Sequence, residues 1–188
     1  MRNLLRSGGY YLISGWARIK DDVYYDKGHT WLKIEDGFAR IGINDFAQKL
    51  IGPITEIVVP SIGQKIERGK PSFEIRFRDN SLTLVAPIDG HVVKRNEKVI
   101  TDPTLINRDP YGEGWIVIVS PLDLESSIKL FFSPELAAVW MNQCFEILRK
   151  KTCEFIQDGG NLLEGVLETQ NLEKRDILLK EFFSSGSS

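Results

Sequence analysis

Two short segments with alternating side chains, separated by a polar break, are the feature that most limits how this chain can fold. Apolar and charged side chains alternate over residues 73–78, and apolar side chains alternate again over residues 82–85. A period of two is typical of a strand with one buried face. Asp79-Asn80 lies in the break, and both residue types accept the left-handed conformations that a two-residue turn requires. The sequence therefore predicts a β-hairpin with Asp79-Asn80 as its turn.

A short internal repeat predicts two β units of the same kind. Residues 57–66 and 84–93 each contain an apolar strand, a proline, two further residues, a glycine and a second strand. Two such units in succession favour two halves related by a pseudo-two-fold axis. We expect these halves to pack face to face as a flattened barrel.

Further strands and one short helix are predicted before the repeat. Residues 23–25, 30–34 and 38–43 have the β-branched and aromatic side chains that strands favour. Asn44 is a good N-cap for a helix over residues 45–51, which begins with an acid and is followed by a glycine.

The last third of the chain changes to helical patterns. Ser133 is an N-cap followed by a proline and an acid, and a helix is predicted from there to about Lys151. Its apolar stripe, which we expect to be buried, consists of Leu136, Trp140, Cys144, Ile147 and Leu148. After Gly159-Gly160, the pattern predicts one or two more helices over residues 162–183.

These patterns divide the chain into four parts. They are an N-terminal extension at 1–22, a β domain at 23–122, a helical extension at 123–183 and a tail at 184–188 that we expect to be disordered. The predicted fold class is α+β, mainly β, with an α-helical C-terminal extension.

Composition and charge exclude several classes of function. The net charge of −2 gives no electrostatic case for binding nucleic acid or an anionic membrane. No apolar stretch approaches membrane-spanning length, and the N-terminus has no sustained apolar run, so we expect a cytoplasmic protein. Cys144 and Cys153 are predicted to lie on opposite faces of one helix, as small buried side chains.

No pattern of an enzyme or a metal site is present in the sequence. Phosphate-binding loops, nucleophile elbows and dinucleotide fingerprints are all absent. His29 and His91 fall in different β units, and no cysteine or pair of acids has metal-ligand spacing with either. We therefore expect no catalytic residue and no metal.

Motifs spread over residues 23–122 resemble the H protein of the glycine cleavage system. The matching segments are Gly28-His29-Thr30-Trp31, Gly42-Ile43-Asn44, Leu50-Ile51-Gly52, Val59-Pro60, Gly63, Pro87, Gly90, Asn96, Pro103, Leu105-Ile106-Asn107 and Asp109-Pro110-Tyr111-Gly112-Glu113-Gly114-Trp115. This resemblance implies a lipoyl-domain-like barrel-sandwich hybrid. It also implies a carrier that moves an aminomethyl group between glycine-cleavage enzymes on a lipoyl-lysine at an exposed hairpin.

The attachment motif of that family, Glu-Ser-Val-Lys-Ala, aligns without gaps to Arg76, Phe77, Arg78, Asp79 and Asn80. Asp79 thus stands at the lysine position, and no lysine occurs over residues 71–93. Lipoylation forms an amide with a primary amine, which neither a carboxylate nor a guanidinium can supply. We therefore expect lipoate, and any other cofactor, to be absent.

Several alternatives remain open from the sequence. The large side chains of Trp140, Met141 and Phe145 suit either a packed core or a surface that binds a partner. The main hypothesis is a non-catalytic binding or regulatory module that docks on a lipoate-related or glycine-cleavage-type enzyme complex. The alternatives are a carrier that uses another group, with Lys70, Lys94 and Lys98 as the nearest amines, and a structural subunit. The oligomeric state is left open.

Overall fold

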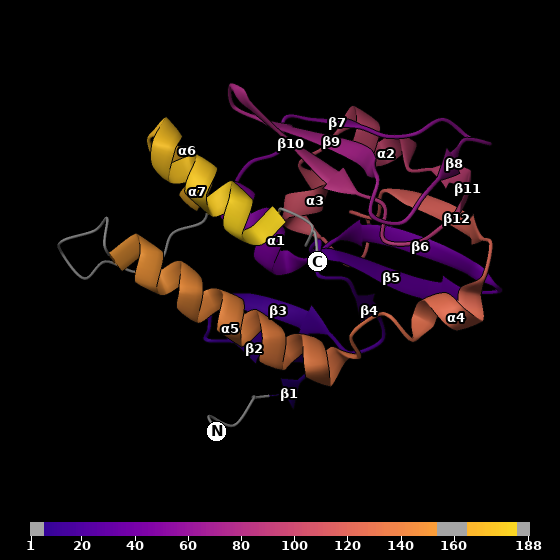
Figure 1. Cartoon of the computed structure of the whole chain (residues 1–188), viewed down its shortest axis with the longest axis horizontal. Helices are drawn as coiled ribbons and strands as arrows, with labels where there is room; N and C mark the ends of the chain where they lie inside the picture. Colours follow the sequence, from indigo (N-terminus) through magenta and orange to yellow (C-terminus); the bar gives the residue numbers. More distant parts are fainter. Residues whose placement is uncertain (1–5, 154–164, 184–188) are drawn as a thin grey trace.

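The structure, a computed structural model, describes residues 6–153 and 165–183, and it confirms a mainly β fold with helices at its C-terminal end (Figure 1). The strands are β1 (Arg6–Ser7), β2 (Tyr10–Ile13), β3 (Ala17–Lys20), β4 (Tyr24–Tyr25), β5 (Thr30–Glu35), β6 (Phe38–Ile43), β7 (Glu56–Val58), β8 (Lys65–Ile66), β9 (Pro71–Phe77), β10 (Asn80–Val85), β11 (Gly90–Arg95) and β12 (Val117–Pro121). The helices are α1 (Asp45–Ile51), α2 (Glu97–Thr101), α3 (Leu105–Arg108), α4 (Leu124–Ile128), α5 (Pro134–Cys153), α6 (Val166–Thr169) and α7 (Leu172–Phe183).

The strands form three sheets. A six-stranded sheet has the order β4-β5-β6-β12-β11-β8, a three-stranded sheet has the order β10-β9-β7, and β1, β2 and β3 form a meander. All three sheets are open within the described residues. The flattened barrel predicted from the sequence is therefore not closed by strand pairing. This part of the prediction is corrected, because the repeat specified two sheets without specifying that their edges pair.

The internal repeat corresponds to two crossings between the same two sheets. β7 and β10 both pair antiparallel with β9 in the small sheet, while β8 and β11 pair with each other at the end of the large sheet. Pro60 and Pro87 lie between the two strands of each unit, where a missing N–H removes no bond from a ladder. The predicted relation between the two units is thus visible in the topology.

Trp31 lies on β5 of the large sheet and is completely buried. Its Nε1 donates to the carbonyl oxygens of Ile43 (3.1 Å) and Pro110 (2.9 Å). A Cβ at Gly42 would lie 2.4 Å from the Trp31 ring, so only glycine permits this packing. Trp115, by contrast, is only partly buried, under the cations of Arg40 and Lys94.

Helix α1 begins and ends where the sequence predicted. Asn44 is its N-cap, with Oδ1 accepting a hydrogen bond from Ala47 N (2.9 Å). Gly52 ends the helix at a φ of +89°, which a side chain would resist. Six of the seven helix residues are buried, so α1 is held on all sides rather than on one face.

Residues 6–20 pack against the same core as the rest of the chain. Strands β2 and β3 contact α5, β3 also contacts α1, and the buried Ile13, Ala17 and Ile19 join the common hydrophobic cluster. In Figure 1, α5 lies along the meander of β1 to β3. The N-terminal segment therefore supplies the surface on which α5 is buried.

The buried face of α5 differs from the predicted stripe. Leu136 is 59% exposed and Ile147 37% exposed, whereas Cys144 and Leu148 are buried as expected. The buried side chains of α5 are Ala137, Ala138, Met141, Cys144, Phe145 and Leu148, and the helix packs on β2 and β3 of the meander. The helix has apolar side chains on two sides, and the position of the meander decides which side is covered.

Helices α6 and α7 return across the molecule to α1. Gly165 N donates to Lys49 O (2.7 Å) at the end of α1, and Lys151 of α5 forms an ion pair with Glu181 of α7 (3.2 Å). The predicted break at Gly159-Gly160 and the predicted disordered tail at 184–188 lie outside the described residues. None of the described helices is both long enough and apolar enough to span a membrane.

Candidate functional site

The hairpin of β9 and β10 is built as the alternation predicted, but its turn is one residue earlier. Asn80 pairs with Phe77 across the ladder, so the two-residue loop is Arg78-Asp79. Phe73, Ile75, Phe77, Leu82 and Leu84 are all buried. The prediction of an Asp79-Asn80 turn is therefore wrong, because Asn80 is used as the first residue of β10.

Asp79 stands at the exposed tip of this hairpin. Arg78 before it has a φ of +49°, a left-handed conformation that is unfavourable for a residue with a Cβ atom, while Asp79 itself has a negative φ. The residue at the family's lysine position is thus presented to solvent at the most distant point of the hairpin.

Arg76 is held by acidic side chains on the exposed side of the small sheet. Its Nη1 lies 2.7 Å from Glu56 Oε2 on β7, and its Nε lies 2.9 Å from Glu74 Oε1 on β9. All three side chains are substantially exposed, so these ion pairs contribute little to stability. They do hold the guanidinium between a glutamate of β7 and a glutamate of β9.

Asn80 joins the hairpin to the C-terminal helices. Arg175 of α7 donates through Nη1 to Asn80 Oδ1, through Nε to Leu167 O (3.1 Å) and through Nη2 to Gln170 O (3.1 Å). One guanidinium therefore connects the hairpin, α6 and the start of α7, which lie beside one another in Figure 1. Sequence reasoning missed Arg175, since no motif links two residues so far apart.

The amines considered as substitutes for the lost lysine lie away from the tip. Lys70 precedes β9 at the opposite end of the hairpin from Asp79. Lys94, on β11, lies over the ring of Trp115, and Lys98 Nζ is 2.7 Å from Glu113 Oε2. None of these three amines occupies a position from which an arm would extend as it would from residue 79.

The three residues of the candidate partner surface have different environments. Met141 is completely buried and Phe145 is almost so, both on the face of α5 toward the meander. Trp140 is partly buried, with its ring 4.8 Å from that of His29 and 5.5 Å from that of Phe132. In this conformation only Trp140 has surface that a partner could contact.

His29 lies at the centre of an aromatic cluster. Its ring stacks on Phe46 of α1 at 5.1 Å and also contacts Phe183 of α7 at 5.5 Å. Burial lowers the pKa of the imidazole from its ordinary value to about 3, against the opposing effect of the Asn44 hydrogen bond. His91 is exposed on β11, and the described residues contain no group of side chains that could hold a metal ion.

Cys144 is a buried, unreactive thiol. Burial raises its pKa to about 12, so almost none of it is thiolate at neutral pH. The side chain of Cys153 lies outside the described residues.

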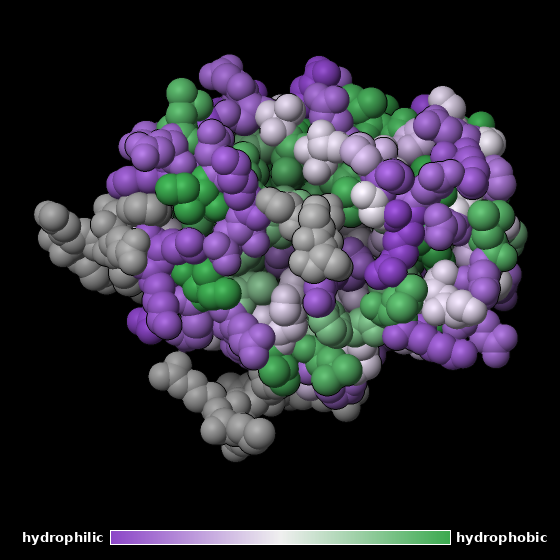
Figure 2. Space-filling model, viewed as in Figure 1, coloured by the Kyte–Doolittle hydropathy of each residue, from purple (hydrophilic) through white to green (hydrophobic). Residues whose placement is uncertain are grey.

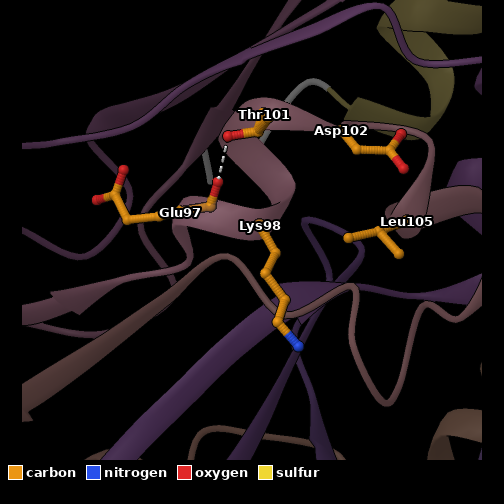
Figure 3. A pocket seen from close by; sticks show the side chains of 5 residues that line it. All are labelled: Glu97, Lys98, Thr101, Asp102 and Leu105. Carbon is orange, nitrogen blue, oxygen red and sulfur yellow. Dashed lines mark hydrogen bonds between the residues drawn. The ribbon is translucent and has the colours of Figure 1, made fainter.

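A shallow depression lies beside α2 (Figure 3). It is lined by Glu97, Lys98, Thr101, Asp102 and Leu105. Thr101 Oγ1 donates to the Glu97 carbonyl (2.9 Å), and Asp102 pairs with Arg108 (2.7 Å), so these polar groups are used within the protein. The depression brings together no set of groups with an evident chemistry.

Comparisons with known proteins agree with the fold. The sequence profile of the family described as Glycine cleavage H-protein matches residues 23–142. The glycine cleavage system H protein of Carboxydothermus hydrogenoformans is 38% identical over 117 residues, covering 62% of this chain and 89% of that protein. The corresponding protein of Bacillus velezensis is 37% identical over 114 residues, covering 61% and 90%.

A solved structure shows the same relation. The crystal structure of a glycine cleavage system H protein from Mycobacterium marinum has a TM-score of 0.53 and 31% sequence identity, covering 55% of this chain and 87% of that one. The chain therefore belongs to the glycine cleavage H-protein family. The matched region extends into α5, and α6 and α7 lie beyond it.

Proposed function

We propose that this chain is a non-catalytic, non-lipoylated member of the H-protein family that acts as a binding or regulatory module. In this proposal it keeps the carrier's surface and docks on a glycine-cleavage-type or lipoate-related enzyme complex in the cytoplasm. The observation that carries the proposal is Asp79 at the exposed tip of the β9–β10 hairpin, where the family's attachment motif has lysine.

The contact of Arg175 with Asn80 supports the same proposal. A swinging arm must move freely between successive active sites, so its attachment point should project from the rest of the protein. Here Asn80, next to Asp79, is bonded to a guanidinium that also holds two carbonyl groups of the C-terminal helices. A hairpin fixed in this way suits a stationary recognition surface better than a moving carrier.

The alternative functions fit the described residues less well. A carrier with another attachment group would need an amine at an exposed tip, whereas Lys98 is paired with Glu113 and Lys94 covers Trp115. A purely structural subunit would explain the loss of the lysine but gives no reason for a retained hairpin with an exposed tip. We therefore rank both alternatives below the binding module.

Intact-mass measurement tests the absence of lipoylation. The chain is produced together with free lipoate and a lipoate ligase, beside a lysine-bearing H protein of the family as the positive control. We expect the control to gain a lipoyl group and this chain to keep its unmodified mass. A lipoyl adduct on any lysine of this chain would overturn the proposal.

Binding to purified enzymes tests the docking role. Isothermal titration against a glycine decarboxylase and an aminomethyltransferase measures affinity for the chain and for the variants Arg76→Ala and Asp79→Ala. We expect binding that these hairpin variants weaken, while Ile62→Ala, which alters an exposed loop before β8, leaves affinity unchanged. Absence of binding to both enzymes would contradict this choice of partner.

A further inference from the structure

Helix α5 has a second apolar face beside its buried one, formed by three exposed side chains and, at its edge, by Trp140, whose ring packs on His29. We call Leu136, Val139, Trp140 and Ile147 the outer stripe. Leu136 is 59%, Val139 51% and Ile147 37% exposed, and Trp140 is partly buried. In Figure 2, apolar side chains appear along the course of α5 among its charged ones. Isolated exposed apolar residues are common, but a row of them on one helix face is typical of an interaction surface.

The spacing of the outer stripe is that of a helix that pairs with another helix. With the exposed Gln143 between them, Leu136, Trp140 and Ile147 of the outer stripe give intervals of four, three and four residues. Side chains at these intervals stay on one side of an α-helix, here about 140° around the helix axis from the buried side. Together with the buried face, it makes α5 apolar on two sides, a pattern expected of a helix that is covered on both.

We propose that the outer stripe is covered by α5 of a second copy of this chain, packed antiparallel across a two-fold axis. In this antiparallel arrangement, the residues along the outer stripe of one copy match those of the other. When Leu136 faces Ile147 of the second copy, Ile147 faces Leu136 in return, and Trp140 comes beside Gln143 of the second copy. Gln143 is exposed, and its amide can both donate and accept at the centre of such a seam.

The charges of α5 select the same direction. Glu135 lies in the first turn, next to Leu136, while Lys150 lies in the last turn, close after Ile147. Antiparallel pairing therefore brings the acidic end of one copy to the basic end of the other. Parallel pairing would put like charges together at both ends, which costs free energy.

The size of the surface predicts a weak dimer. Leu136 to Ile147 spans about 16 Å at 1.5 Å per residue, roughly three helical turns. A contact between two helices of this length belongs with the small, weak interfaces, which bury less than about 1,200 Å² in total. We therefore expect a dimer whose population depends on protein concentration.

Sedimentation velocity on the full chain tests the proposal. We expect the mean sedimentation coefficient to rise with concentration toward that of a dimer at about 100 μM. Leu136→Glu and Ile147→Glu should each give a monomer at the same concentration, with an unchanged melting temperature because both side chains are exposed. Ile62→Glu, equally exposed but on the loop before β8, should leave the dimer intact.

A charge exchange tests the antiparallel direction separately. Lys150→Glu should weaken association, and adding Glu135→Lys should restore it, because the two ends then again carry opposite charges. Glu135 also accepts a hydrogen bond from Tyr11 Oη (2.9 Å), so the melting temperature of Glu135→Lys alone serves as the control for folding. A full chain that remains monomeric, or a dimer that Leu136→Glu and Ile147→Glu leave unchanged, would overturn the proposal.

Discussion

Arg78 carries the backbone strain of the hairpin, because it is the residue of the two-residue loop with a positive φ. We predict that Arg78→Val unfolds more easily than Arg78→Gly by about 1–2 kcal/mol, since a β-branched side chain resists this conformation and glycine does not. Both variants lose the guanidinium, so the difference between their free energies of unfolding reports only the backbone conformation at residue 78. Chemical denaturation measures this difference.

Asp79 provides the control for this turn. The sequence alone predicted a positive φ at Asp79, which would make Asp79→Val costly. With its observed negative φ, Asp79→Val should change the free energy of unfolding by no more than about 0.5 kcal/mol, the usual range for an exposed position. A larger loss at Asp79 than at Arg78 would mean that the turn is assigned to the wrong pair.

The missing lysine and the hairpin could be predicted from the sequence, whereas the position of the turn could not. The absence of a lysine over residues 71–93 is a fact of the sequence, and alternation alone located the hairpin. The turn was displaced by one residue because Asp79 and Asn80 suit a turn equally well by type. What decides between them is the pairing of Asn80 with Phe77 and its contact with Arg175, which is 95 residues away.

At the scale of elements, helix α5 has two apolar faces, one buried and one largely exposed. Met141 is completely buried against the meander, whereas Leu136 is mostly exposed. We predict that Met141→Ala lowers the free energy of unfolding by about 2–5 kcal/mol, as cavity-forming substitutions do. Leu136→Ala should change it by about 0.5 kcal/mol or less when measured on the monomer. Equal losses at both positions would contradict the assignment of the faces.

This helix also shows why the predicted stripe was only half correct. The bounds of the helix follow from Ser133, Pro134 and the apolar spacing, and they agree with the structure within two residues. The choice of buried face needs the position of the N-terminal meander, which is encoded in residues 6–20. Periodicity within one helix gives no information about that distant surface, and here both sides of the helix are apolar.

The contact between α7 and the hairpin makes a second element-scale prediction. Arg175→Ala leaves three acceptors without their donor, at Asn80, Leu167 and Gln170. We expect a loss of about 1–3 kcal/mol, the usual cost of partly buried acceptors left unpaired by a charged donor. Amide hydrogen exchange should also become faster in Asn80 and its neighbours in β10.

A lysine at the same position provides the matched control. Arg175→Lys keeps the charge but cannot reach three acceptors with one rigid planar group, so its stability should fall between those of the parent and Arg175→Ala. If Arg175→Ala leaves both stability and exchange unchanged, the C-terminal helices are not held to the hairpin by this residue.

At the scale of the whole molecule, the sequence specified the β units better than their assembly. The repeat of residues 57–66 in residues 84–93 predicted two equivalent units, and both indeed cross from the small sheet to the large one. It did not specify whether the sheet edges pair, because pairing depends on the lengths and twist of strands from distant segments. The flattened barrel that the sequence predicted is built from open sheets, because the repeat contains no information on the pairing of their edges.

His29 lies where three parts of the molecule meet. Its ring contacts Phe46 of α1, Trp140 of α5 and Phe183 of α7, and it is 99% buried as a neutral group. A proton on this ring would be buried without a charged partner among the contacts described. The pKa of His29 is accordingly lowered to about 3, and its ionisation is linked to the packing of α1, α5 and α7 on the β fold.

This linkage predicts a loss of stability in mild acid. The unfolded chain has a histidine pKa of 6.5, so below that value the unfolded state binds a proton that the folded state excludes. The contribution of His29 is therefore complete above pH 6.5 and decreases by 1.36 kcal/mol per pH unit as the pH falls toward about 3. Between about pH 7.5 and about pH 5, His29 alone should remove about 2 kcal/mol from the free energy of unfolding.

Chemical denaturation of the parent and of His29→Asn at both pH values measures this contribution. Asparagine accepts the positive φ of +63° at this position, so the variant should fold, with lower stability at pH 7.5 and a flatter decrease toward pH 5. Burial raises the pKa of Asp26, which acts in the opposite direction, and the comparison with the variant removes that effect. His91→Asn, at an exposed position of β11, is the matched control for replacing a histidine by asparagine. If His29→Asn and the parent lose the same free energy between the two pH values, His29 is not the residue that couples protonation to the assembly of α1, α5 and α7.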